Sequence, residues 1–343
     1  MNNISNFIDT DKISIKYREA AINLEQKKLL ITNLKGTEQE KDLTEPANCN
    51  GFGRIRHFRL STNSNWIQNP LPIVPACKKL GFPSTQMLRA QVFQNAVCNW
   101  RCWYCYVPFD LLTANKDHSS WLAPSDLIDF YLRQDDPPTV IDLSGGQPDL
   151  TPEWVPWMMS ELRSRGLDKK VYLWSDDNLS NDYFWKYLSK EDIALVASYE
   201  NYGRVCCFKG FDSNSFNFNT KADPQLFDRQ FSLMKKFIDL GIDVYAYVTF
   251  TTPSNEDIPE KIHSFMNHLQ QLDNCLPLRT IPLEIRAFTP VTSRLDLKLD
   301  PTYENSMQYQ YVAIDAWKHE LQTRYTEEEL SKPISDILIG GNN

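Results

Sequence analysis

The chain has 343 residues, of which 42% are hydrophobic, 23% charged and 12% aromatic. This composition is typical of a folded globular protein and excludes a disordered or collagen-like chain. Asp and Glu outnumber Lys and Arg by 44 to 36, so the net charge is −8. A chain of this sign repels phosphate backbones on average, and we therefore expect no nucleic-acid partner.

The sequence contains no stretch that approaches the roughly 18 consecutive apolar residues of a membrane span. Its first residues also lack the basic and apolar regions of a signal peptide. We therefore expect no membrane association and a cytoplasmic location. In that reducing compartment the eight cysteines are expected to be thiols or metal ligands rather than disulfides.

Residues 1–47 are polar and charge-rich, and their apolar residues have helical spacing over residues 17–30. Residues 48–85 are rich in Asn, Pro and Gly, which indicates an ordered coil with short strands. We therefore interpret residues 1–86 as an N-terminal extension and irregular cap.

A local group of basic residues lies in this cap, at Arg54, Arg56, His57 and Arg59. It could bind an acidic group or RNA stacked on the neighbouring aromatic residues. The alternation of the stretch favours the simpler interpretation, an edge strand with its charges pointing outward.

From residue 87 onward, strand patterns alternate with helix patterns. The strands are expected at residues 89–97, 139–143, 171–174, 204–208, 242–251 and 281–288. Strands that alternate with helices predict parallel pairing through right-handed crossovers, and hence an α/β fold. In parallel barrels and open sheets, functional sites form at the carboxyl ends of the strands.

Three thiols follow the first of these strands. Cys98, Cys102 and Cys105 are spaced as C-x3-C-x2-C, and thiolates are soft ligands for zinc or for iron–sulfur clusters. A structural zinc ion would need a fourth ligand, such as His118 or the distant His57, and Cys102 with Cys105 alone could form a redox dithiol. Neither alternative explains the position of Cys98 on the same loop. A four-iron cluster held by three thiolates explains it and leaves one iron open.

The cysteine spacing, with the aromatic Tyr104 just before the last cysteine, resembles the signature of the radical S-adenosylmethionine (radical SAM) superfamily. Residues 144–148 (SGGQP), at the end of the second strand, resemble the Gly-Gly-Glu-Pro turn of that family. Such a turn contacts the amino end of the methionine moiety through backbone that glycines allow to come close. Here Gln147 replaces the usual Glu, which keeps an accepting carbonyl but loses a charge.

The resemblance covers residues 87–290 and implies a partial (β/α)6 TIM-type barrel preceded by the N-terminal extension. Residues 291–343 would then form a C-terminal helical tail. The pattern is closest to the compact single-cluster type and is similar to the pyruvate formate-lyase activating enzyme group.

The family's contacts carry over to residues that match its motifs. The resemblance implies that Cys98, Cys102 and Cys105 hold a [4Fe-4S] cluster. It implies a SAM site made of Tyr104, Ser144, Gly145, Gly146, Gln147, Pro148, Ser175, Asp176, Asp177, Lys209 and Arg286. Beyond the cluster and SAM, no separate catalytic residue is expected.

Each group in this set has an expected partner on SAM. Tyr104 would lie near adenine, and the polar residues at the end of the third strand would contact the ribose. Lys209 and Arg286 would meet the carboxylate. The alternatives are core packing for Tyr104 and ordinary solvated charges at strand ends for the others.

By this resemblance, the protein is an oxidoreductase that cleaves SAM reductively to a 5′-deoxyadenosyl radical, which abstracts hydrogen from an unidentified substrate. A flavodoxin or ferredoxin would supply the electron. The substrate could be a glycyl-radical protein, a peptide, a nucleotide or a small molecule. A zinc- or dithiol-based binding or redox protein that uses the same cysteines is the alternative. Buried thiols are favoured over a second metal site for Cys49, Cys77, Cys206 and Cys207.

Overall fold

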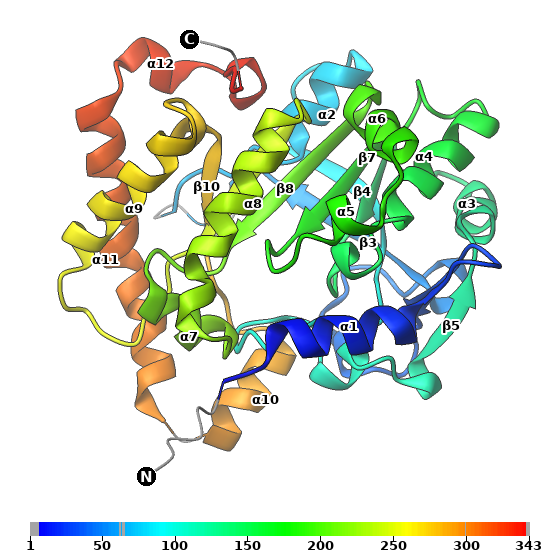
Figure 1. The fold of residues 1–343 in the computed structure, drawn as a ribbon, viewed down its shortest axis with the longest axis horizontal. Coiled ribbons are helices and arrows are strands. Elements are labelled where there is room, and N and C mark those ends of the chain that lie inside the picture. Colours follow the sequence, from blue (N-terminus) through cyan, green and yellow to red (C-terminus); the bar gives the residue numbers. More distant parts are fainter. Residues whose placement is uncertain (1–6, 62, 64–65, 299, 341–343) are drawn as a thin grey trace.

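The computed structural model describes residues 7–61, 63, 66–298 and 300–340. Its central feature is a seven-stranded sheet with the strand order β10-β9-β8-β7-β6-β4-β3. The parallel strands are β4 (Met87–Phe93), β6 (Val140–Leu143), β7 (Tyr172–Asp177), β8 (Tyr202–Phe208), β9 (Val244–Thr249) and β10 (Thr280–Leu283). β3 (Gly53–Arg59) pairs antiparallel with β4. The sheet curls into a half-barrel (Figure 1), so the fold is mixed α/β and consistent with a partial TIM-type barrel.

Helices between the parallel strands cover the outer face of the sheet (Figure 1). They are α3 (Pro124–Leu132), α4 (Trp154–Ser164), α5 (Tyr183–Tyr187), α6 (Lys190–Ser198), α8 (Phe227–Asp239) and α9 (Ile258–Leu272). α7 (Ser213–Thr220) lies beyond the carboxyl end of β8 (Figure 1), where its carbonyls accept from the Arg101 and Trp103 amides. In α8, Phe227, Phe231, Met234 and Ile238 recur at helical spacing and are buried. This apolar stripe binds the helix to the sheet, at about 1.5–3 kcal/mol for each large side chain that is fully buried.

The two faces of the sheet carry different clusters. On β7, Leu173 packs with the outer helices, whereas Tyr172 and Trp174 face the opposite, inner side. There α2 (Ile73–Leu80) joins the same inner cluster, and Trp174 lies 5.7 Å from the ring of Tyr245 on β9. An aromatic core therefore fills the amino-terminal end of the half-barrel, and the polar inner residues lie nearer the carboxyl ends of the strands.

Further elements precede and follow the large sheet. α1 (Thr10–Ala21) leads into a three-stranded antiparallel sheet of β1 (Ile22–Asn23), β2 (Lys28–Thr32) and β5 (Ser119–Leu122). After β10 come α10 (Thr289–Lys298), α11 (Pro301–Arg324) and α12 (Glu327–Ser331), with α11 packed along α9. Figure 1 shows α1 and α10 at the same end of the molecule.

The structure corrects two sequence-based expectations. The helix expected over residues 17–30 ends at Ala21, because residues 28–32 form β2 and pair with β5. The last strand, expected over residues 281–288, ends at Leu283, because the Gln310 side chain bonds both backbone groups of Ile285. The edge strand expected around residues 54–59 is β3, which adds a seventh strand to the six parallel ones.

The described helices include none with both the length and the apolar composition that a membrane crossing requires.

Candidate functional site

The three motif cysteines lie on the loop that leaves the carboxyl end of β4, and all three are free thiols with partial exposure. Cys102 interacts electrostatically with both Cys98 and Cys105, so the loop brings the three sulfur atoms into one neighbourhood. Burial raises the pKa of Cys98 above its usual range and that of Cys102 to about 12. The Cys98 and Cys102 thiols are therefore protonated at neutral pH until a positive ligand displaces their protons.

Hydrogen bonds from other parts of the protein hold the backbone of this loop. The Cys98 amide donates to the Leu112 carbonyl at 3.1 Å, and the Cys105 amide donates to the Cys102 carbonyl at 3.0 Å. The Arg101 guanidinium donates to the carbonyl of Cys98 at 2.6 Å and to that of Trp100 at 2.8 Å. Satisfied backbone groups fix the course of the loop.

The N-terminal helix α1 also supports the cysteine loop. The Asn99 side chain donates to Ser14 at 2.8 Å, the Trp100 indole donates to Thr10 at 3.0 Å, and Arg101 donates to the Tyr17 hydroxyl at 2.7 Å. Because these contacts are specific to the tertiary structure, no local pattern in α1 signals them.

The glycine turn that follows β6 lies directly against the start of the cysteine loop. Gly145 and Gly146 have φ angles of +92° and +67°, in the left-handed region that glycine tolerates. An added Cβ on Gly146 would lie 2.3 Å from the Asn95 carbonyl oxygen. The Gln147 amide donates to the Val97 carbonyl at 2.8 Å. The two sequence motifs, about forty residues apart, therefore form one continuous surface.

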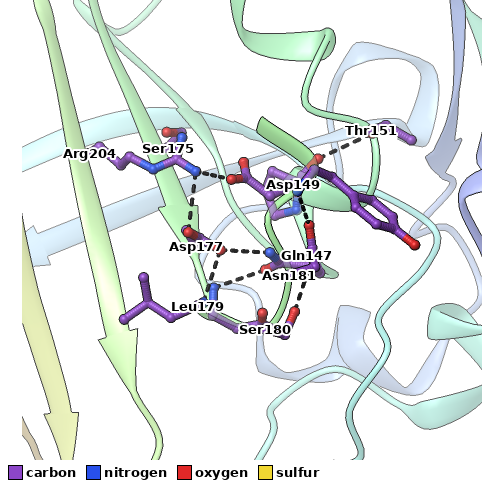
Figure 2. A network of polar contacts seen from close by, with 12 residues as sticks. Gln147, Asp149, Thr151, Ser175, Asp177, Leu179, Ser180, Asn181 and Arg204 are labelled. Atoms are coloured by element: carbon purple, nitrogen blue, oxygen red, sulfur yellow. Dashed lines mark hydrogen bonds and ion pairs between the residues drawn. The ribbon is translucent and has the colours of Figure 1, made fainter. Parts of the chain in front are cut away.

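The side chain of Gln147 is buried and fully engaged with the end of β7 (Figure 2). Its amide nitrogen donates to Asp177 Oδ1 at 2.7 Å, and its oxygen accepts from the Asn178 amide at 3.0 Å. The Leu179 amide donates to the same Asp177 oxygen at 3.0 Å. Gln147 thus links the glycine turn to the next strand.

A buried arginine lies behind this link (Figure 2). Arg204 is fully buried, pairs with Asp149 and lies 3.3 Å from Asp177. It also donates to the Tyr202 hydroxyl, which is 2.7 Å from Ser175 Oγ. Burial raises the pKa of Asp149 to about 7, although Arg204 opposes the shift. Ser175 and Asp177, expected to contact ribose, are thus part of a buried polar network, and the buried Pro148 begins the short turn that carries Asp149.

Asp176 points the other way, toward the inner face of the sheet. Its Oδ2 accepts from Ser144 at 2.8 Å, and its buried Oδ1 has no hydrogen-bond partner among the described residues. Asp142 lies on the same inner face, two residues before Ser144, with Arg56 at 3.5 Å. Burial, with a smaller effect of Asp176, raises the pKa of Asp142 to about 8, whereas Arg56 lowers it. Asp142 was absent from the sequence-based site.

Two of the basic residues of β3, Arg54 and Arg56, belong to this inner group, whereas Arg59 is exposed and His57 contacts Glu45. Arg54 is 7% exposed and donates to the Tyr106 hydroxyl at 3.0 Å, and Arg56 faces Asp142. The expectation that both charges point outward is wrong, because one face of β3 closes the half-barrel. The alternation of Arg54, Ile55 and Arg56 signals a strand, but it does not reveal which face is inside.

Lys209 follows β8 on the same side. Burial acts to lower its pKa, but Cys207, Tyr104 and the motif cysteines together raise it well above the usual range. Lys209 therefore lies beside the cysteine loop, close to Cys207 and Tyr104. The Tyr104 hydroxyl lies 2.9 Å from Thr249, at the end of β9.

Arg286 lies beyond β10, with an exposed side chain that pairs with Glu284 at 2.6 Å. It differs in this respect from Lys209, which is half-buried at the end of its strand.

In the part of the chain that the structure describes, no three His, Cys, Asp or Glu side chains surround a single point at metal-ligand distances. One zinc ion needs such a grouping, with four ligands in a tetrahedron. The thiolates of an iron–sulfur cluster each bind a different iron and are spread further apart. His118 lies in a short turn, η4 (Lys116–His118), where its carbonyl accepts from Asn33.

Two cavities lie apart from this group. One, of about 520 Å³, is lined by residues of α7, α8 and α9 that include Asp212 and Lys261. The other, of about 780 Å³, lies between α2 and residues 329–337. Neither lining includes a motif cysteine or a residue of the glycine turn.

No family model matches the chain, and no curated protein matches it. Among solved structures, the chain is similar to Streptococcus suis SuiB bound to S-adenosylmethionine, with 18% identity and a TM-score of 0.37 over 52% of this chain and 37% of SuiB. It is also similar to SuiB bound to the precursor peptide SuiA, with 17% identity and a TM-score of 0.36 over 61% of this chain and 45% of SuiB. The chain therefore spans less than half the length of the SuiB chains it matches.

Proposed function

We propose that this protein is a radical SAM enzyme in which Cys98, Cys102 and Cys105 hold a [4Fe-4S] cluster. One observation carries the proposal: the glycine turn lies against the cysteine loop, so closely that Gly146 has no room for a Cβ beside the Val97 carbonyl. Two motifs that are separate in the sequence meet at the carboxyl ends of adjacent parallel strands, where such folds build their sites.

The residues present fit this group. Three partly exposed thiols share one loop, and that loop is fixed by backbone and arginine contacts. A fourth cysteine does not occur on it, which leaves one iron open for an outside ligand. When bound, the cluster would supply the electron that cleaves SAM and yields the 5′-deoxyadenosyl radical.

We assign the SAM contacts to the backbone and side-chain polar groups that remain available to bind a ligand. Gly145 and Gly146 would offer backbone groups to the methionine moiety, because the Gln147 side chain is already engaged. Asp176 would accept a ribose hydroxyl with its unpartnered Oδ1. Lys209 would bind the carboxylate as a charged ammonium, and Tyr104 would lie against adenine.

Three of the residues expected at the SAM site take supporting roles in this proposal. Ser175 and Asp177 would act through the buried Arg204 network, and Gln147 would hold the turn against β7. Arg286 would contribute only if SAM or substrate reaches the far end of β10.

The substrate would enter at the same end of the half-barrel, since the aromatic core fills the other end. Its reacting group would face Asp142, Arg54 and Arg56 on the inner surface. The candidate substrates are a glycyl-radical protein, a peptide, a nucleotide and a small molecule. A low-potential flavodoxin or ferredoxin would be the electron donor.

Anaerobic reconstitution with iron and sulfide tests the proposal. We expect a brown protein with about four irons per chain and a reducible cluster whose paramagnetic resonance spectrum changes when SAM is added. With dithionite and SAM it should form 5′-deoxyadenosine, detected by mass spectrometry. A colourless protein that takes up one zinc ion under the same conditions would instead establish the zinc alternative.

A further inference from the structure

We propose that Arg294 is a positioning residue for the cysteine loop and that its charge raises the reduction potential of the cluster. This inference rests on the proposed function. Arg294 lies on α10, outside the range covered by the sequence resemblance, and nothing in the motifs points to it.

The first argument is geometric. One nitrogen of the Arg294 guanidinium donates to the Trp103 carbonyl at 3.0 Å and also to the Cys105 carbonyl. The other donates to the Val107 carbonyl at 2.6 Å. The planar fork therefore holds both sides of Cys105 in place, which a lysine with a single nitrogen cannot do equally well.

The second argument is that Arg294 is itself held in position. Its guanidinium lies 4.0 Å from the centre of the Phe109 ring, which favours a cation at that place. Asp42 accepts from the Thr289 amide at 3.0 Å and thereby caps the first turn of α10. Glu38 accepts from Ser293 at 2.7 Å. Residues 38–42 therefore hold α10, which carries Arg294, in place.

The third argument is electrostatic. Arg294 interacts with the thiols of Cys105 and Cys102, and within the described residues no carboxylate lies at ion-pair distance from it. The nearest acidic influence is the more distant Glu38. Reduction adds negative charge to a cluster, and an uncompensated cation in a partly buried place stabilises that charge. The presence of Arg294 should therefore make the cluster easier to reduce.

Two variants separate position from charge. Arg294→Lys keeps the positive charge but loses the fork, and Arg294→Gln loses both. Arg165→Gln is the matched control, because it removes a guanidinium that has two ion pairs, with Glu161 and Asp129, on the exposed surface of α4. For each reconstituted protein we would measure iron per chain, the rate of iron loss to a chelator and the midpoint potential by spectroscopic redox titration.

For Arg294→Gln we expect the reduced-to-oxidised ratio at a fixed potential to fall about tenfold, a shift of ~59 mV to more negative potential for a one-electron couple. Iron loss should be about tenfold faster, in the range found when groups that orient metal ligands are removed. Arg294→Lys should lose iron faster but keep a potential near that of the unmodified protein. Arg165→Gln should match the unmodified protein in both measurements.

The inference is wrong if Arg294→Gln matches Arg165→Gln in potential and iron retention. Should Arg294→Gln fail to fold, the comparison of Arg294→Lys with the control still decides whether the fork retains iron. If the unmodified protein forms no cluster, the proposed function itself fails, whereas a normal cluster with unaffected variants overturns only the role of Arg294.

Discussion

An added Cβ on Gly146 would lie 2.6 Å from the carbonyl oxygen of Val97, the residue before Cys98. This contact makes the glycine turn and the cysteine loop one unit. A change in either must displace the other, because the obstructing atom is backbone and not the end of a flexible side chain.

We therefore expect Gly146→Ala to abolish iron binding and to destabilise the protein. The left-handed φ angle alone costs an alanine about 1–2 kcal/mol, and the collision adds about 1–3 kcal/mol. Gly166→Ala is the control, because its φ angle is +64° and the space around it is open. Iron content and urea unfolding of both variants check this, and equal losses in the two would contradict the argument.

Gln147→Glu restores the residue that the family pattern has at this position, yet we expect it to destabilise the fold. The new carboxylate would lie beside Asp177, where Gln147 now donates at 2.7 Å. Two like charges in a buried place raise the pKa of one of them, so the stability deficit is absent at low pH and grows as pH rises through that pKa. We expect a loss of about 1–3 kcal/mol at pH 7. Denaturant unfolding at pH 5 and pH 7 tests whether the loss of stability grows with pH, and the exposed Gln225→Glu variant is the control.

Arg204→Met should be one of the most destabilising substitutions in the chain, at about 3–5 kcal/mol. It leaves Asp149 and Asp177 buried without their cation. Adding Asp149→Asn to the same chain should recover part of the loss, because one uncompensated carboxylate is removed. Denaturant unfolding of the single and double variants measures this coupling, and strict additivity would argue against it.

Asp142 should make stability depend on pH. Its folded-state pKa of about 8 lies above the usual value of 3.8, so the folded state binds the proton more tightly. The resulting stability is fully present below about pH 4 and is lost as pH rises through about 8. Asp142→Asn should flatten this slope, and exposed Asp135→Asn should not. Thermal unfolding of both variants between pH 5 and 9 measures this slope, and equal slopes in the two would contradict the prediction.

Cys102→Ala should lose both iron and 5′-deoxyadenosine formation. Cys275→Ala and His118→Ala should retain both, since Cys275 lies at the start of a distant turn and His118 on η4. Iron analysis and product detection after reconstitution provide the measurement. Loss of metal in the His118 variant would favour the zinc alternative.

Local patterns predicted the parallel strands β4, β6, β7, β8 and β9 and the two motifs, because buried apolar runs and glycine spacing are properties of neighbouring residues. The short strand β5 was not predicted. The division of the chain at residues 86 and 290 and the assignment of the SAM contacts remain predictions. The predicted end of β10 was wrong, because beyond Leu283 the side chain of Gln310 on α11 bonds the backbone of Ile285 in place of a neighbouring strand.

The supports of the site could not be predicted from local sequence. Ser14 and Arg294 contact the cysteine loop from opposite ends of the chain, across 85 residues for Ser14 and Asn99 and 189 residues for Arg294 and Cys105. Arg54 and Arg56 were assigned to the wrong face, because a two-residue period does not state which side is enclosed. Such contacts depend on how the whole chain folds, and only the motif residues themselves carry a local signal.

Arg101 and Arg294 donate to carbonyls on both sides of the cysteines, so side chains of the protein shape this loop. Small zinc modules, by contrast, depend on their metal to fold. If the chain holds the proposed cluster, loss of that cluster to oxygen should therefore leave the fold largely in place. We would then expect protein purified in air to take up iron and sulfide again.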